Sequence, residues 1–219
     1  ITVYPSEWNH NKKYTNIYEF IHTNITTNGH CISQLTPISR AFYKLVEIIN
    51  TGDIIEKYKF KNIKTFHIAE APGGFIEAIS YLRKNKNDFY YGTTLLDSND
   101  PNIPYWKKSK LVSQNNIIIE NGVDNTGNLY NENNFLYFNE KYFDSFEIVT
   151  ADGGIDFSQN YEKQEVLAFK LILCEIFYSF ILLKKGGTFI LKIFDIFYKP
   201  TVQCIYLLSS IFNELYIIK

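Results

Sequence analysis

A carboxylate and an ammonium group stand where two apolar, strand-like runs of this sequence end. Asp152 follows the run 146–151 and precedes two glycines, which leave space around its carboxylate. Lys192 lies within the apolar run 188–194, where an ammonium is costly to bury unless it is paired or neutral. A lysine facing solvent on an edge strand is the alternative. We interpret the two side chains as candidates for acid–base chemistry at one edge of a sheet.

A second feature is the turn that follows the run 64–69, with the sequence Glu70-Ala71-Pro72-Gly73-Gly74-Phe75. Its two glycines let the backbone pass close to a ligand, and Pro72 fixes one dihedral of the turn. The turn lacks the Lys-Ser/Thr pair of a phosphate-cradling P-loop and the three-glycine spacing of a dinucleotide site. A plain tight turn is the alternative to a ligand-binding loop.

A third feature is Asp124, which lies in the glycine-flanked loop 120–127. Its carboxylate could accept a hydrogen bond from an adenine amino group if this loop lies beside the glycine turn. The alternative is an Asx-type turn, in which the carboxylate bonds to its own loop, and the segment taken by itself favours that turn.

The elements that would position these residues alternate between strand and helix. Apolar strand-like runs occur at residues 64–69, 89–96, 116–120, 146–151, 188–194 and 214–218. Helical spacing occurs at residues 38–50, 75–84, 162–184 and 200–212, and the pair Gly186-Gly187 is expected to end the third helix. The alternation predicts an α/β fold with a mostly parallel sheet and helices on both faces. Such sheets bind ligands at the carboxyl ends of their strands.

The composition is that of a folded domain with little net charge. Hydrophobic residues make up 46% of the 219 residues, and the formal net charge is −1. A protein that binds nucleic acid needs a positive surface, which must therefore be local here. The candidate is a segment with four lysines and two aromatic residues, Lys57, Tyr58, Lys59, Phe60, Lys61 and Lys64. A merely solvated charged segment is the alternative.

Other sequence features bound the domain organisation. We expect an irregular N-terminal arm over residues 1–35 and one domain over residues 36–219, since domains commonly have about 100–200 residues. No apolar run reaches the roughly 18 residues that span a bilayer, and the three cysteines lack metal-ligand spacing. The chain contains no methionine and ends at Lys219 within a predicted strand, which predicts that the domain is truncated at its C-terminus.

Four segments occur in an order that resembles the FtsJ-like ribose 2′-O-methyltransferases. They are residues 66–75 (FHIAEAPGGF), 124–127 (DNTG), 150–153 (TADG) and 186–192 (GGTFILK). The resemblance covers about residues 36–219. It is strongest to the branch that methylates mRNA caps at the second transcribed nucleotide and to related enzymes of large DNA viruses. It implies a Rossmann-like, S-adenosylmethionine-dependent methyltransferase fold.

The resemblance also implies a Lys-Asp-Lys-Glu tetrad, whose first three members match Lys44, Asp152 and Lys192. Lys192 would be the base for the ribose hydroxyl, Lys44 would favour loss of its proton, and Asp152 would orient it. The glutamate of the family follows a later strand, beyond Lys219. S-adenosylmethionine would be held by Glu70, Ala71, Pro72, Gly73, Gly74, Phe75, Asp124 and Asp152, without a metal ion. The acceptor would be capped RNA, with other mRNA-capping enzymes as candidate partners and no membrane partner.

Three other functions fit parts of the sequence. A methyltransferase acting on ribosomal or transfer RNA would have the same fold. A catalytically silent subunit that holds cofactor or RNA in a capping complex is favoured by the near-neutral charge and opposed by the matching lysines and aspartate. A nicotinamide-dependent oxidoreductase is disfavoured by the glycine spacing. We expect the cytoplasm, a viral factory or the virion for a viral enzyme, and the nucleus for a cellular one.

Overall fold

The computed structural model describes residues 32–96, 113–155 and 161–218, together with residues 7, 21, 105, 106 and 111. Most of the predicted arm, residues 1–35, lies outside the described residues. No helix in the described part of the chain combines the length and the apolar character needed to cross a membrane.

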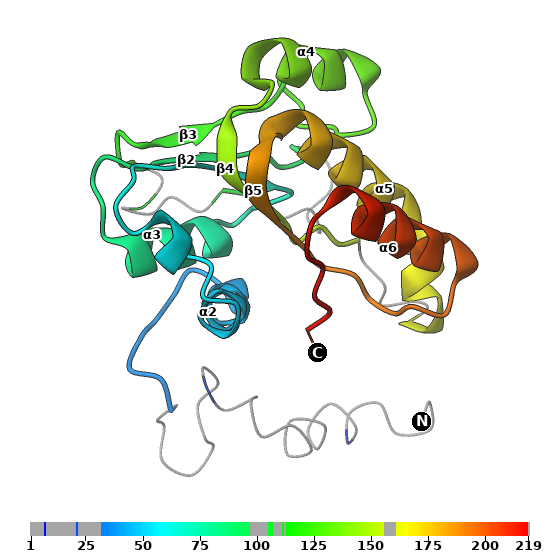
Figure 1. Cartoon of the computed structure of the whole chain (residues 1–219), viewed down its shortest axis with the longest axis horizontal. Helices are drawn as coiled ribbons and strands as arrows, with labels where there is room; N and C mark the ends of the chain where they lie inside the picture. Colours follow the sequence, from blue (N-terminus) through cyan, green and yellow to red (C-terminus); the bar gives the residue numbers. More distant parts are fainter. Residues whose placement is uncertain are drawn as a thin grey trace.

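Five parallel strands form one sheet in the order β3-β2-β1-β4-β5 (Figure 1). They are β1 (Lys64–Ile68), β2 (Phe89–Gly92), β3 (Ile117–Ile119), β4 (Phe146–Ala151) and β5 (Leu183–Leu191). The strand order reverses between β1 and β4, and this is the point at which open α/β sheets bind ligands. The predicted parallel sheet and five of its six predicted strands are confirmed.

Helices cover both faces of the sheet, as predicted. They are α2 (Ala41–Thr51), α3 (Gly74–Arg83), α4 (Glu132–Tyr142), α5 (Gln164–Leu182) and α6 (Lys199–Ile211). Figure 1 shows α2 and α3 together on one side and α4, α5 and α6 on the other. Neighbouring residues of β4 point to opposite cores, since Ile148 packs with α2 and α3 whereas Val149 packs with α4 and α5.

Two predicted features of the C-terminal part are wrong. Residues 214–218 are irregular rather than a strand: their apolar side chains are exposed, and no described strand pairs with them. The Gly186-Gly187 pair does not end the long helix, because α5 ends at Leu182 and the glycines lie within β5. There the β4–β5 register shifts, and Gly186 has a φ of +75°, so the glycines accommodate an irregularity of the strand.

The helix α4 was not predicted from the sequence. Its eleven residues, ENNFLYFNEKY, contain few aliphatic residues, and only Asn134 and Phe138 are buried. The side chain of Asn131 accepts a hydrogen bond from Asn133 N and caps the first turn.

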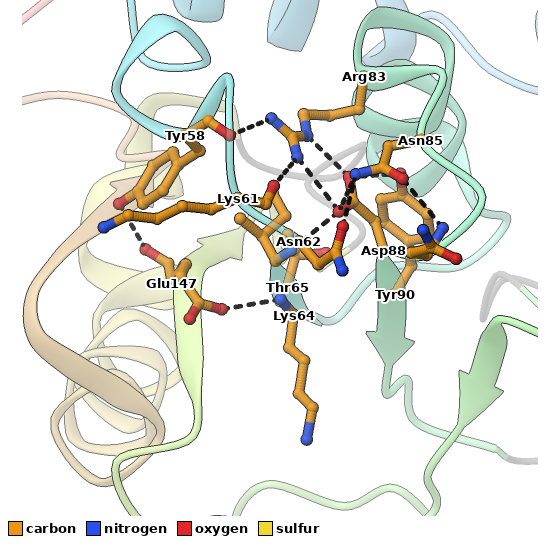
Figure 2. Close-up of polar contacts among 12 residues, drawn as sticks. Tyr58, Lys61, Asn62, Lys64, Thr65, Arg83, Asn85, Asp88, Tyr90 and Glu147 are labelled. Carbon is orange, nitrogen blue, oxygen red and sulfur yellow. Dashed lines mark hydrogen bonds and ion pairs between the residues drawn. The ribbon is translucent and has the colours of Figure 1, made fainter.

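A buried ion pair fixes the amino edge of the sheet (Figure 2). Arg83, at the end of α3, contacts Asp88 through Nε and Oδ2 at 2.7 Å, and the two side chains are 3% and 0% exposed. Arg83 also donates hydrogen bonds to the carbonyl oxygens of Tyr58 and Lys61. Asp88 accepts a hydrogen bond from Ile63 N. The network therefore ties the chain that enters β1 to α3 and β2.

This placement separates the lysine-containing segment 57–64 from the predicted catalytic edge. Lys64 begins β1, and its backbone N–H donates to Glu147 at the amino end of β4 (Figure 2). The carboxyl end of β1 lies four residues further on, about 13 Å away at the usual rise of a strand. The segment predicted to be a local positive surface for nucleic acid therefore lies at the edge of the sheet opposite Asp152.

We predict that Arg83→Met lowers the free energy of unfolding by about 3–5 kcal/mol, because it leaves the carboxylate of Asp88 buried without its ion-pair partner. Urea denaturation measures the change. The matched control is Lys59→Met in the exposed Lys59–Glu56 pair, where about 0–1 kcal/mol is expected. Equal effects of the two substitutions would contradict the structural role of the buried pair.

Candidate active site

The three residues predicted to be catalytic lie together at the carboxyl edge of the sheet. Asp152 follows β4, and its Oδ1 lies 3.0 Å from Lys192 Nζ. Its Oδ2 lies 3.7 Å from Lys44 Nζ. Lys192 Nζ also donates a hydrogen bond to the backbone oxygen of Asp152 at 3.0 Å. One carboxylate therefore lies between two ammonium groups that come from α2 and from the residue after β5.

The exposure of the three side chains suits a reaction at the surface of the sheet. The side chain of Asp152 is 14% exposed, that of Lys192 is 27% exposed, and that of Lys44 is 55% exposed. The backbone N–H of Lys192 donates to Ala151 O, so the parallel pairing of β4 and β5 continues one residue beyond β5. Although β5 is an edge strand of the described sheet, Lys192 does not simply face solvent: it is partly buried and paired with the neighbouring strand's aspartate.

Close packing of α2 against the glycine turn brings Lys44 to this edge. Phe42 and Leu45 are buried in the core between α2, α3 and the sheet. At Gly74, a Cβ atom would lie 2.2 Å from Ser39 Oγ and 3.2 Å from Phe42 N, so only glycine permits this approach. The second glycine of the turn therefore serves the packing of α2, which positions Lys44.

The glycine turn, residues 70–75, is stabilised by hydrogen bonds to the side chain of Glu70. This side chain is buried, and its Oε1 accepts hydrogen bonds from Phe75 N at 2.8 Å and Ile76 N at 3.0 Å. Burial raises the pKa of Glu70 to about 8, and the negative charge of Asp152 acts in the same direction, while the two N–H donors oppose it. Phe75 is 3% exposed and packs in the core, so neither its side chain nor its N–H is left for a ligand.

Gly73 is the position where the turn requires glycine for its backbone conformation. Its φ of +113° is a conformation that L side chains rarely adopt. A Cβ atom there would lie in van der Waals contact with Ile38 and Leu111, at 3.8 Å from each. Gly73 is buried, whereas Ala71 and Pro72 before it are partly exposed, so these two residues are the part of the turn that a ligand could reach.

Asp124 forms the Asx-type turn that the sequence favoured. Its Oδ1 accepts hydrogen bonds from Thr126 N, Thr126 Oγ1 and Asn134 Nδ2, and its Oδ2 accepts one from Asn131 Nδ2. The donors from Thr126 and Asn134 hold the pKa of Asp124 below its usual range. Oδ2, with one donor, is the atom left to accept a bond from a ligand, so the adenine contact stays a prediction.

Several buried polar atoms around the carboxyl edge have no hydrogen-bond partner among the described residues, among them Ser39 Oγ, Thr93 Oγ1 and Asn121 Oδ1. Thr93 follows β2, Asn121 follows β3, and Ser39 precedes α2. Buried polar atoms are normally paired, so these atoms fit a ligand rich in hydroxyl and amino groups, as S-adenosylmethionine is. Within the described part of the chain, no three His, Cys, Asp or Glu side chains group as metal ligands.

The sequence analysis missed two glutamates of α5. Glu175 is buried, and its Oε1 accepts a hydrogen bond from Gly153 N at 3.0 Å. Glu165 is 8% exposed and accepts hydrogen bonds from Phe197 N and Tyr198 N, in the segment that follows Lys192. The signal for Glu175 was present, since a lone acidic residue in an apolar helical run is as unusual as Lys192 in an apolar strand.

Comparisons with known proteins place the chain in a family. A family model described as FtsJ-like methyltransferase matches residues 37–219. The chain is 29% identical over 244 residues to cap-specific mRNA (nucleoside-2′-O-)-methyltransferase 1 of Dictyostelium discoideum, covering 100% of this chain and 30% of that protein. It is 27% identical over 226 residues to cap-specific mRNA (nucleoside-2′-O-)-methyltransferase 2 of Danio rerio, covering 98% of this chain and 30% of that protein.

A viral relative and a solved structure are also similar. A methyltransferase of African swine fever virus is 27% identical over 199 residues, covering 83% of this chain and 45% of that protein. The crystal structure of a ribosomal RNA methyltransferase from Plasmodium falciparum has a TM-score of 0.55 and 21% identity, covering 83% of this chain and 90% of that one. At that identity the likeness concerns the fold. The chain spans 30% of the length of the two cap-specific relatives.

The raised pKa of Glu70 predicts how stability depends on pH. Between its ordinary value of 4.5 and about 8, folded Glu70 holds a proton that the unfolded chain has released. The contribution of Glu70 to stability therefore falls as pH rises through this window. Glutamine still accepts the two N–H bonds and never ionises. We expect the Tm of Glu70→Gln, relative to the native chain, to rise by several degrees between about pH 5 and pH 8.

Thermal unfolding at constant ionic strength measures this difference. Glu132→Gln, at an exposed position in the first turn of α4, is the control and should show no such trend. A Tm difference for Glu70→Gln that does not vary with pH would show that Glu70 is already ionised in the folded chain.

Proposed function

Because the chain belongs to the FtsJ-like methyltransferase family, we propose that it transfers a methyl group from S-adenosylmethionine to a ribose 2′-hydroxyl of a cap-proximal mRNA nucleotide. The observation that carries the proposal is the contact of Asp152 with both Lys44 and Lys192 at the carboxyl edge of the sheet. Two of the relatives bear names with this activity, which supports mRNA as the acceptor.

Lys192, Lys44 and Asp152 have different roles in the proposed methyl transfer. S-adenosylmethionine supplies an electrophilic methyl group on a sulfonium. Lys192 Nζ would accept the 2′-hydroxyl proton as the ribose oxygen bonds to the methyl carbon and the carbon–sulfur bond breaks, which leaves an uncharged thioether. Positioning would supply much of the rate. Lys44 places a second ammonium group beside the carboxylate of Asp152. Asp152 in turn orients Lys192 through the 3.0 Å contact and through its own backbone oxygen.

The cofactor would lie along the carboxyl edge from β1 to β3. The backbone of residues 71–73 would hold the methionine part, and Oδ2 of Asp124 would accept a bond from the adenine amino group. The unpartnered Thr93 Oγ1 and Asn121 Oδ1 support this course. Glu70 and Gly74 act indirectly, since Glu70 holds the start of α3 and Gly74 admits α2.

The segment after Lys192 offers a surface for RNA. Phe197 is 89% exposed, five residues beyond Lys192, and Glu165 fixes the backbone N–H groups of Phe197 and Tyr198. An exposed aromatic ring held on a fixed backbone is the kind of platform on which an unpaired base stacks. This supports a single-stranded acceptor. A ribose in ribosomal or transfer RNA is the alternative acceptor, and capped against uncapped RNA distinguishes them.

We predict that Lys192→Arg lowers the single-turnover rate of methyl transfer to capped RNA by about 10²–10⁴-fold, because arginine stays protonated and cannot act as the base. Calorimetry should show that S-adenosylmethionine binding survives. Gly73→Val is the complementary variant: a branched side chain at a φ of +113° should abolish cofactor binding. Equal rates on capped and uncapped RNA would contradict the cap assignment, and a near-normal rate for Lys192→Arg would contradict the base.

A separate prediction concerns Phe197. Phe197→Ala should weaken binding of a short capped RNA by about 5- to 150-fold, which corresponds to the loss of one stacked base at about 1–3 kcal/mol. Fluorescence anisotropy with labelled RNA measures this. Phe60→Ala is the matched control, since Phe60 is 94% exposed but lies at the opposite edge of the sheet. Similar losses in both variants would show that Phe197 makes no specific contact.

A further inference from the structure

The side chain of Glu175 contacts the backbone immediately after Asp152. Its side chain has no exposed surface, and its Oε1 accepts a hydrogen bond from Gly153 N at 3.0 Å. A Cβ atom at Gly153 would lie 2.2 Å from that oxygen and 2.9 Å from Leu171 Cδ2. Gly153 is therefore required by the approach of Glu175 from α5, and the carboxyl group fixes the peptide that follows Asp152.

The second oxygen of this carboxyl group is unusual. Glu175 Oε2 is buried and has no hydrogen-bond partner among the described residues. A charged carboxylate in that position is costly. Burial raises the pKa of Glu175 to about 8, the charge of Lys192 and the Gly153 N–H oppose the rise, and Asp152 adds to it. Glu175 therefore holds a proton at neutral pH.

The charged and titratable groups around Glu175 come from several elements. They are Lys192 after β5, Asp152 after β4, Cys174 on α5 itself and Tyr130 before α4. Of these, Lys192 and Asp152 belong to the proposed catalytic group. A change in the charge of Glu175 therefore acts on Lys192, the proposed base, and on Asp152, which orients it.

We propose that Glu175 is a positioning residue for methyl transfer: its buried carboxyl group fixes the backbone of Asp152, and its protonation state sets the electrostatic balance at Lys192. The inference rests on the proposed function for its catalytic meaning, whereas the effect on Lys192 is a property of the folded chain. Neutral Glu175 favours loss of the proton from Lys192. Ionised Glu175 adds a negative charge that retains the proton.

The test compares the chain with its Glu175→Gln variant. Glutamine can still accept the hydrogen bond from Gly153 N, but it stays uncharged at every pH. We measure how the reaction of Lys192 with limiting acetic anhydride depends on pH, using mass spectrometry of the intact folded chain after digestion. The midpoint of this titration should fall by roughly one pH unit in Glu175→Gln, as the removal of a nearby charge predicts.

Glu147→Gln is the matched control. Glu147 contacts Lys184 and the N–H of Lys64 at the amino edge of the sheet, so its substitution should leave the Lys192 midpoint unchanged. Superimposable Lys192 titrations for the native chain and Glu175→Gln would overturn the proposal. The labelling needs no methyl transfer, so it separates a failure of this inference from a failure of the proposed function.

The rate of methyl transfer supplies the second measurement. The pH profile of the single-turnover rate should shift to lower pH in Glu175→Gln by the same amount as the labelling midpoint, with the KM for S-adenosylmethionine unchanged. A purely structural glutamate would leave the profile in place. A labelling shift without a matching rate shift would overturn the catalytic part of the inference, because Lys192 would then not be the group that limits the rate.

Discussion

The contact of one carboxylate with two ammonium groups imposes the main constraint on this fold. Asp152 follows a central strand, Lys192 follows the next strand, and Lys44 comes from a helix that precedes the whole sheet. The three converge only if β4 and β5 keep their register to the last residue and α2 packs onto the turn after β1. The register is kept by the pairing of Ala151 with Leu191, and the packing depends on the missing side chain of Gly74.

Buried carboxyl groups hold the loops around this contact in place. Glu70 accepts two N–H groups at the start of α3, Glu175 accepts the N–H of Gly153, and Glu165 accepts two N–H groups before α6. Each one satisfies backbone donors in a loop or in the first turn of a helix, where neither the sheet nor the helix provides a partner. The loops around the proposed active site are therefore held in place by hydrogen bonds to buried side chains.

The sequence predicted what depends on local patterns and failed where distant contacts decide. The apolar runs correctly predicted the strands β1 to β5. The positions of Asp152 and Lys192 at the ends of two of these runs predicted that they lie at one edge, because the carboxyl ends of parallel strands meet there. The run 214–218 has the same local pattern, but no strand among the described residues lies beside it. Glu175 was missed because a helix gives no hint of which loop lies against its buried face. The lysines at 57–64 were predicted to form a local positive surface without a position on the sheet, since charge alone does not give position.

The buried acids also bear on how a chain with a net charge of −1 can approach a polyanion. With Glu70 and Glu175 protonated, the group formed with Asp152, Lys44 and Lys192 carries one net positive charge. With both ionised, the same group carries one net negative charge. Below about pH 8 the two protonated acids add no negative charge beside Asp152, Lys44 and Lys192, which favours the approach of a phosphate-bearing ligand to this site. Burial of the two acids thus removes local negative charge that would otherwise oppose a polyanion.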